Sequence, residues 1–468
     1  MPKRNLFVLL MMIATAVIAW LARDSAGHGR RFAEVLGAID RAYLEPVDQQ
    51  SLFDAAMEGV FSRLDEHSAF VVGERRSQLE SLLDQEFGGV GVELIRTDAH
   101  RGITVVSPVL GSPAWHAGIA AGDQILAIDG MSTVSMSLEE AFRRLRGRPG
   151  TAVRLSVASP AAASEESAAS EESAAALTRD IPLVREVVKT ESVQGDRRRQ
   201  DGAWEWMVEG ETDAAIIRIT NFGERTSDEL RRAVEAIESR SNGAGGESEH
   251  VPQAANGLLI LDLRGNAGGL LSSAVEVCDI FLDEGVIVST KGRGAVGTFG
   301  DESAALDVRR ATRGAALAGM PMAILIDGLT ASAAEVVAAC LQDHGRAIVV
   351  GSRSFGKGTV QSIMPLSDGS GLLKLTTSEY LRPSRVNIHR RIDDDDSVAA
   401  WGVRPDRGCE ITPTGRQIES LQAWRRIRDV VPAKGGSMGP MQSESQASQP
   451  RWLDPVLAKA VDTLRERD

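Results

Sequence analysis

The hydrophobic pattern of residues 257–281 predicts a buried strand, a glycine turn and a helix. The run Gly257–Leu263 is almost wholly apolar, as in a buried strand, and it leads into Gly268 and Gly269. Apolar residues then recur at helical spacing as far as Phe281. Glycines at such a junction can offer bare backbone N–H groups to an oxyanion. A plain strand-to-helix turn would also use glycine, so both interpretations stay open.

A second helix is predicted from the apolar run Val336–Leu341, and a serine stands at its start. Ser332 and Glu335 form the Ser-x-x-Glu pattern of a capping box. The same position suits a nucleophile, because free N–H groups and a favourable helix dipole lie beside it. A helix start and a catalytic serine are therefore compatible interpretations of Ser332.

Lys357 stands between Gly356 and Gly358, and this setting is typical of two different roles. A neutral lysine can take the proton from a serine hydroxyl, and burial favours the neutral form. Flanking glycines let the backbone crowd a reaction centre without clashing Cβ atoms. A lysine between glycines is also a common turn residue in solvent, so Lys357 alone does not establish catalysis.

The N-terminal hydrophobic run predicts export or membrane attachment. Lys3 and Arg4 precede the apolar residues Leu6–Ala22, which are interrupted only by Thr15. This length falls between the core of a signal peptide and a full membrane span. We expect an uncleaved signal anchor, with the body outside the cytoplasm by the positive-inside rule, and a cleaved signal peptide is the alternative.

Beyond the central domains the pattern becomes polar, with one amphipathic segment at the end. Residues 416–430 predict a polar helix, and residues 433–449 have the composition of a linker. Apolar residues on one face of 452–467 predict an amphipathic helix, which we expect to dock on the body rather than to pair with a second subunit. The acidic low-complexity stretch 159–176 lacks the apolar content of a core.

Composition excludes several other classes of protein. The 468 residues are enough for about three domains, and the net charge of −13 argues against nucleic-acid binding. Cys278, Cys340 and Cys409 are odd in number and widely spaced, so they give no disulfide framework, and the first two fall in apolar helical patterns typical of a core. The acidic run Asp393–Asp396 is expected to be a solvated loop, and no metal or other cofactor is expected.

Three motifs together resemble those of the carboxyl-terminal processing proteases, also called tail-specific proteases. They are Asp-Leu-Arg-Gly-Asn-Ala-Gly-Gly at 262–269, Thr-Ala-Ser-Ala-Ala-Glu at 330–335 and Phe-Gly-Lys-Gly-Thr-Val-Gln at 355–361. The resemblance implies that Ser332 is the nucleophile, Lys357 the general base and Gln361 the residue that orients the lysine. The implied oxyanion donors are the N–H of Ala333 and that of either Gly268 or Gly269.

A second resemblance concerns the first half of the chain. Residues 87–94 read as a glycine-rich loop that enters a strand, and 122–130 have the sequence Gly-Asp-Gln-Ile-Leu-Ala-Ile-Asp-Gly. Together they resemble PDZ modules of bacterial proteases, with a helix near 137–145 as the other wall of the peptide groove. The resemblance implies that the loop binds a peptide's C-terminal carboxylate. The residues of this loop would be Gly88, Gly89, Val90, Gly91 and Val92.

The resemblances imply a multi-domain α/β protein with a protease core of the crotonase or Clp type. The expected segments are a signal anchor or signal peptide at 1–24, a helical segment at 30–80, a PDZ domain at 82–187 with its insertion at 159–176, the core at 188–408 and a helical extension at 409–468. The implied function is a serine endopeptidase that cleaves proteins near their C-termini, with the PDZ domain recognising the substrate or gating access. Expected partners are protein or peptide tails, the membrane, and a homodimer mate or adaptor.

Two other functions are compatible with parts of the sequence. One is a catalytically silent PDZ scaffold, which the presence of Ser332, Lys357 and Gln361 together disfavours. The other is a crotonase-like acyl-CoA enzyme, because the resembled protease core shares that fold and a backbone oxyanion hole. The PDZ pattern and the membrane segment fit poorly with a CoA ester as the substrate.

Overall fold

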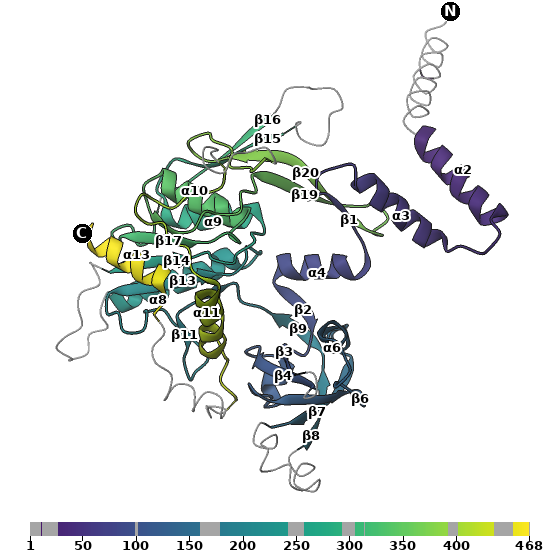
Figure 1. Cartoon of the computed structure of the whole chain (residues 1–468), viewed down its shortest axis with the longest axis horizontal. Coiled ribbons are helices and arrows are strands. Elements are labelled where there is room, and N and C mark those ends of the chain that lie inside the picture. The colour runs from purple at the N-terminus through teal and green to yellow at the C-terminus, as the bar shows by residue number, and fades with distance from the viewer. Residues whose placement is uncertain are drawn as a thin grey trace, which may run out of the picture. The chain divides into compact units, whose positions relative to one another are not determined.

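The computed structural model describes residues 11, 27–98, 102–159, 178–241, 257–292, 305–312, 314–391, 401–434 and 453–467 (Figure 1). The predicted signal anchor, apart from Met11, and the insertion after Ser159 lie outside these residues. Within them, no helix combines the length and the apolar character that crossing a bilayer requires. The chain divides into two compact units, one of 1–73 with 361–376 and the other of 74–360 with 377–468.

The first unit is built from helices held by aromatic contacts. It contains α2 (Gly27–Ala42), α3 (Gln49–Phe61) and the short strand β1 (Ala69–Val71), which pairs antiparallel with residues 372–374 of β20 (Leu372–Leu381). Asp48 caps α3 by accepting a hydrogen bond from the Ser51 amide at 3.0 Å. The rings of Phe32, Phe53, Phe61 and Phe70 form a chain of contacts with centroids 6.0 to 6.5 Å apart.

The second unit begins in α4 (Gly73–Asp84) and continues into a small β domain. Its main sheet has the order β3-β4-β5-β7-β8, formed by Val92–Asp98, Gly102–Pro108, Gln124–Ile128, Ala152–Ala158 and Thr178–Val184. The short β6 (Met131–Ser132) pairs with β5, while β2 (Glu86–Gly89) and β9 (Glu186–Lys189) form a separate ladder. The helices α5 (Pro113–His116) and α6 (Leu138–Leu145) help to cover a core of aliphatic side chains.

The same unit contains a mostly parallel sheet with the order β10-β13-β14-β17-β18. The parallel strands are Ala214–Ile219, Leu258–Asp262, Met322–Ile326 and Ile348–Gly351, and β10 (Val193–Gln194) pairs antiparallel at the edge. Every residue of the four parallel strands is buried. A strand buried on both faces reads as a continuous apolar run, and for this reason the pattern of 257–263 predicted β14 correctly.

Helices cover both faces of this sheet. On one face the core contains side chains of α8 (Thr226–Ser241), α9 (Leu271–Phe281) and α10 (Ala333–Asp343), which confirms the predicted helices at 274–281 and 336–341. Buried Cys278 and Cys340 belong to this layer, as predicted from their apolar surroundings. On the other face lies α13 (Pro455–Arg465), drawn in yellow in Figure 1 across β14, β17 and β18.

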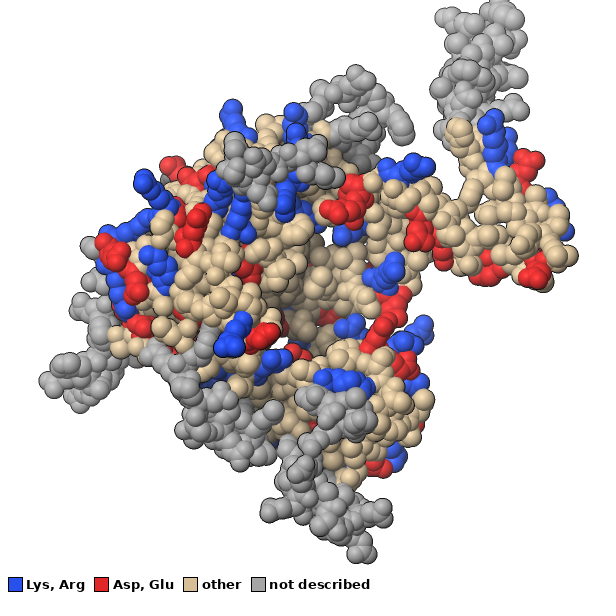
Figure 2. All heavy atoms as spheres, in the orientation of Figure 1, with Lys and Arg blue, Asp and Glu red and all other residues tan. Residues whose placement is uncertain are grey.

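Antiparallel strands and a hairpin complete the sheets. β15 (Val286–Gly292) pairs with β16 (Ala305–Arg310) on one side and with residues 378–381 of β20 on the other. β19 (Thr359–Pro365) also pairs with β20. A two-stranded ladder joins β11 (Arg197–Arg198) to β12 (Trp204–Glu205). On the face drawn in Figure 2, acidic and basic side chains are interspersed, as expected for a solvated surface.

The C-terminal extension docks on the second unit. The predicted polar helix is α11 (Gly415–Arg428), which Thr414 and Gln417 begin as a capping box. The predicted amphipathic helix is α13, and it starts at Pro455 because Asp454 caps it and proline suits the first turn. Val456, Ala460, Val461 and Leu464 are buried against the sheet, so docking is confirmed.

The residues after α11 also contact the small β domain. The amide of Val431 donates to Ser107 Oγ at 3.0 Å, and Trp115 Nε1 donates to the carbonyl oxygen of Pro432 at 2.9 Å. Val430 and Val431 are both buried. The extension therefore packs against the small β domain as well as against the parallel sheet.

Candidate active site

The loop after β14 is fixed by one buried asparagine. Asn266 is completely buried, and its Nδ2 donates to the carbonyl oxygen of Ile219 at 2.8 Å. Its Oδ1 accepts from the amide of Gly268 at 2.8 Å, and its carbonyl accepts from the amide of Ala331 at 2.9 Å. These bonds hold residues 266–268 beside the turn that leads into α10.

Both glycines of this loop have positive φ and lie against other backbone. φ is 104° at Gly268 and 144° at Gly269, in a region that side chains strongly disfavour. A Cβ on Gly268 would stand 2.8 Å from Ser332 Cβ and 3.0 Å from the Ala333 nitrogen. A Cβ on Gly269 would stand 2.0 Å from the Phe222 carbonyl oxygen. Glycine is therefore required at both positions, and Gly268 lies directly beside Ser332 and Ala333.

We expect Gly268→Ala to lower peptidase activity by about 100-fold or more, because the new methyl group would displace the serine beside it. Gly345→Ala is the matched control. Gly345 also has a positive φ of 64°, but the space around its Cβ position is open. That control should lose only about 1–2 kcal/mol of unfolding free energy and keep most activity. Equal loss of activity in the two variants, measured on folded protein, would show that backbone strain rather than contact with Ser332 is responsible.

Ser332 occupies the turn between β17 and α10 in an unusual backbone conformation. Its φ is 57° and its ψ −119°, whereas most N-cap residues are extended. Positive φ at a residue other than glycine costs free energy and is a recurrent property of functional sites. The side chain is half-buried, and the amide donates to Glu335 Oε2 at 2.8 Å. Of the predicted capping box, the hydrogen bond from the Ser332 amide to the Glu335 carboxylate is thus present.

Glu335 connects the serine turn with the lysine loop. Its Oε2 accepts from the amides of Ser332 and Lys357, both at 2.8 Å. Its Oε1 accepts from Ser354 Oγ at 2.5 Å and from the Gly356 amide at 2.7 Å. Burial raises the pKa of Glu335, while these four hydrogen bonds oppose that rise. One carboxylate therefore holds the backbones of Ser332 and Lys357 together.

Lys357 lies in the loop between β18 and β19, half-buried, with its two glycines in close contact with other residues. A Cβ on Gly356 would stand 2.8 Å from the Trp401 ring, and one on Gly358 would stand 2.3 Å from Asn387 Oδ1. The glycines therefore allow close packing around Lys357, as the sequence suggested for a crowded centre. Their tight surroundings distinguish this loop from an ordinary exposed turn.

Gln361 belongs to the other unit of the chain. It lies within β19, and its Nε2 donates to Thr376 Oγ1 at 3.2 Å. Thr376 Oγ1 in turn donates to Asp65 Oδ1 at 2.9 Å. The role predicted for Gln361, to orient Lys357, stays a prediction.

The predicted carboxylate-binding loop is shorter than its sequence suggested. Gly88 and Gly89 are in β2, paired with β9, and Val92 begins β3, so only Val90 and Gly91 lie outside strands. Glycine is required at position 88 of this ladder, because a Cβ there would stand 2.3 Å from the Gly147 carbonyl oxygen. β3 is the free edge of its sheet, and α6 lies beside it. An edge strand next to a helix is the arrangement that accepts an added peptide strand.

The sequence motifs predicted only a helix-capping role for Glu335, although its carboxylate also contacts the lysine loop. Its signal in the sequence is a carboxylate in the otherwise apolar first half of α10. A buried charge requires hydrogen-bonding partners, so such a position predicts a polar cluster even before the partners are known.

Comparisons with known proteins identify two families along the chain. Residues 213–406 match Peptidase family S41, and residues 104–159 match a PDZ domain. The carboxy-terminal-processing protease of Bartonella bacilliformis is 35% identical over 81% of this chain and 76% of its own length. The carboxy-terminal processing protease CtpA of Bacillus subtilis is 28% identical over 87% of this chain and 78% of its own.

Among solved structures, the photosystem II D1 C-terminal processing protease aligns with 85% of this chain and 96% of its own, at 25% identity and a TM-score of 0.40. The sequence relatives decide the family, because their similarity extends across both the PDZ match and the peptidase match. The chain accordingly belongs to the carboxy-terminal processing proteases, serine-type peptidases of family S41 that carry a PDZ domain.

Proposed function

We propose that this peptidase works through a Ser332–Lys357 dyad. The observation that carries the proposal is the Glu335 carboxylate, whose Oε2 accepts from the amides of both residues. A serine hydroxyl needs a base, and a lysine beside it in the neutral form can serve. Gln361, four residues after Lys357, is proposed to orient the lysine when substrate is bound.

In the proposed mechanism, Ser332 Oγ attacks the scissile carbonyl carbon while Lys357 Nζ takes the hydroxyl proton. The C–N bond then breaks, and the proton passes from Lys357 to the leaving amine. A water molecule attacks the acyl-enzyme, giving its proton to Lys357. The bond between the acyl carbon and Ser332 Oγ then breaks, Lys357 returns the proton to Ser332 Oγ, and the new carboxyl terminus leaves. Each proton that the lysine accepts is thus returned within the cycle.

The oxyanion is proposed to bind two backbone N–H groups. One is Ala333, the first residue of α10, which also benefits from the helix dipole. The second comes from the glycine pair. Gly268 already donates its N–H to Asn266, and this favours Gly269 as the second donor.

Substrate selection is proposed to use the small β domain. The free edge of β3 beside α6 can receive the extended C-terminal end of a protein as an added strand. The N–H groups of the turn at Val90 and Gly91 are proposed to receive the terminal carboxylate, together with the adjoining Gly88, Gly89 and Val92. The substrates would then be proteins with accessible C-terminal tails.

We also propose that the enzyme acts outside the cytoplasm, held at the membrane by its N-terminal segment. The support is the sequence pattern of Lys3 and Arg4 followed by the apolar run Leu6–Ala22. A second copy of the chain or an adaptor protein is proposed as a further partner, as expected from the sequence.

The test is cleavage of an unfolded protein by the full-length enzyme in detergent. Wild type and Ser332→Ala are compared on the substrate with a free apolar C-terminus and with an amidated one. We expect cleavage by wild type alone, slowed about tenfold or more by amidation, because the amide removes the charge that the turn would bind. Equal cleavage of the two substrates would disprove carboxylate recognition, while cleavage by both enzymes would disprove the role of Ser332.

A further inference from the structure

A balanced cluster of buried and half-buried charges lies at the carboxyl ends of β13 and β14. Two of its residues come from those strands, one from the loop that follows β14, and three from the C-terminal extension, outside the residues 213–406 that match the peptidase family. The members are Arg218, Asp262, Arg264, Arg425, Asp429 and Asp454. Three cations therefore face three anions, as burial of charge requires.

Arg264 is the centre of this cluster, and it binds two carboxylates at once. Its Nε and Nη2 donate to Asp262 at 2.9 and 2.7 Å. Its Nη1 and Nη2 donate to Asp454 at 3.1 and 2.8 Å. The three side chains are only 7 to 8% exposed. Paired, buried contacts of this kind fix the position of a guanidinium far better than an exposed ion pair does.

The remaining members connect this centre to α11. Arg218 makes two hydrogen bonds to Asp429, at 3.1 and 2.6 Å, and Arg425 lies 3.7 Å from Asp262. Burial would raise the pKa of Asp262, but Arg264 and Arg425 hold that pKa below its usual value. Burial, followed by the nearby Arg218, lowers the pKa of Arg425 to about 10. The charge of each of these groups is therefore influenced by its neighbours in the cluster.

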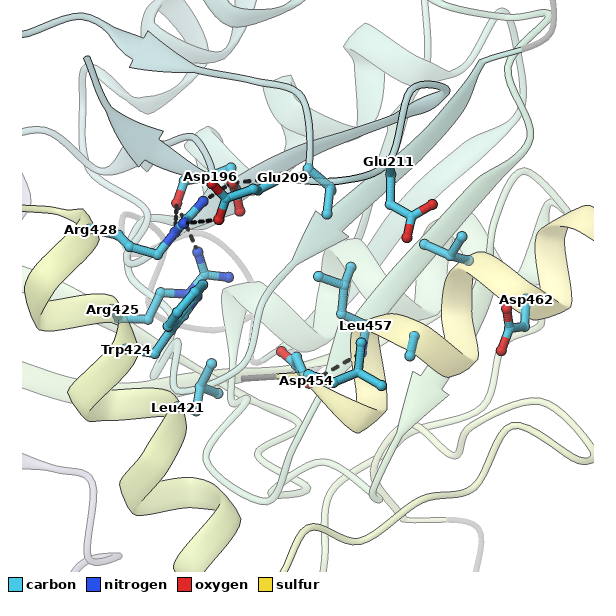
Figure 3. A pocket seen from close by; sticks show the side chains of 14 residues that line it. Asp196, Glu209, Glu211, Leu421, Trp424, Arg425, Arg428, Asp454, Leu457 and Asp462 are labelled. Carbon is cyan, nitrogen blue, oxygen red and sulfur yellow. Dashed lines mark hydrogen bonds and ion pairs between the residues drawn. The ribbon is translucent and has the colours of Figure 1, made fainter. Parts of the chain in front are cut away.

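Asp454 reaches the cluster from the start of α13. Figure 3 shows Asp454 and Leu457 on α13 facing Leu421, Trp424 and Arg425 on α11 across a cavity of 230 Å³. The side chains of α13 pack mainly on the sheet. The bonds from Asp454 to Arg264 are thus a direct connection between the extension and the loop after β14.

That loop carries the glycine pair beside Ser332. Arg264 is its second residue, and the backbone continues through Asn266, whose oxygen atoms hold the amides of Gly268 and Ala331. A displacement of Arg264 would move the proposed glycine donor of the oxyanion hole relative to Ser332. An error of about 1 Å in such a position can cost about 100-fold in rate.

We propose that Asp454 is a positioning residue for catalysis, which holds Arg264 and thereby the oxyanion loop, residues 264–269. The inference rests on the proposed function of Ser332 and of the loop glycines. Asp454 also caps α13, accepting from the amides of Val456 and Leu457 at 3.0 and 3.2 Å. Asparagine caps a helix about as well as aspartate, so it removes the charge and keeps the cap.

The experiment compares full-length wild type, Asp454→Asn and Asp462→Asn on one peptide substrate. Asp462 is an exposed residue of the same helix, so its variant controls for the loss of an acidic charge from α13. We expect kcat of Asp454→Asn to fall about 10- to 100-fold with KM unchanged, because the loop acts on the transition state. Asp462→Asn should match wild type.

A second readout separates positioning from stability. A peptide boronate forms a tetrahedral adduct with the serine, so its affinity should fall by the same factor as kcat in Asp454→Asn. Binding of the uncleaved substrate to Ser332→Ala should be unchanged when Asp454→Asn is added. Unaltered kcat in folded Asp454→Asn, or the same loss in Asp462→Asn, would overturn the proposal.

Two further variants distinguish failure of the proposed Asp454 role from misfolding and from failure of the proposed Ser332 role. If Asp454→Asn does not fold, Asp454→Glu retains the buried charge but moves it by one methylene group, and the same kcat loss is expected. Wild-type kcat in folded Asp454→Glu would then overturn the proposal. Ser332→Ala is assayed alongside, and if it cleaves as fast as wild type, the proposed function of Ser332 fails rather than the role of Asp454.

Discussion

Ser332→Ala is expected to reduce peptide-bond cleavage by at least about 10⁴-fold while the protein stays folded. The change removes one oxygen atom and leaves the backbone contacts of this residue in place. Its amide still donates to Glu335, and its carbonyl still accepts from the Val336 amide at 3.1 Å. Lys357→Ala should cause a comparable loss, because the remaining hydroxyl would have no base.

A buried serine on α9 provides the matched control for this experiment. Ser273 is 4% exposed, and among the described residues its hydroxyl has no hydrogen-bond partner. Ser273→Ala should therefore keep full activity and stability. The initial rate of cleavage and the far-UV circular dichroism spectrum are measured for all variants. A wild-type rate in folded Lys357→Ala would rule out the dyad, even if Ser332→Ala were inactive.

Glu335→Ala is expected to abolish activity and to lower the free energy of unfolding by about 3–5 kcal/mol. The alanine leaves four donors without their acceptor: the amides of Ser332, Gly356 and Lys357, and the Ser354 hydroxyl. Each buried donor left unpaired costs about 1–3 kcal/mol, and the costs overlap because the donors share one site. Denaturant unfolding gives the stability, and activity is compared under conditions where both proteins are folded.

Glu335→Gln tests the same site more finely. An amide has one acceptor oxygen, so it can replace either Oε1 or Oε2 but not both. One pair of donors keeps its acceptor and the other pair loses it, and we expect a destabilisation between those of wild type and Glu335→Ala. If Glu335→Ala lost less than about 1 kcal/mol, the carboxylate would not be what holds the two loops together.

The sequence by itself indicated the protease family and much of the local structure of the described residues. Its apolar runs predicted β14, α9 and α10 because buried elements have strong hydrophobic patterns. Its motifs predicted Ser332 as nucleophile, Lys357 as base and either Gly268 or Gly269 as an oxyanion donor, and these roles stay predictions. The apolar face of the C-terminal helix predicted that this face would be buried, and docking on the body was the expected way to bury it.

Tertiary structure decided what depends on contacts between distant positions. Glu335 looked like a capping residue until folding brought Ser354, Gly356 and Lys357 to its carboxylate. The pairing of Arg264 with Asp454 joins residues 190 positions apart, and no local pattern indicates which carboxylate will meet a given arginine. Gly88 and Gly89 look like a loop, yet they pair with β9 as a strand, and Gly88 must be glycine because a Cβ there would meet the Gly147 carbonyl oxygen. Local patterns report burial and backbone preference, whereas the partner of a buried charge is chosen by the packing of the whole chain.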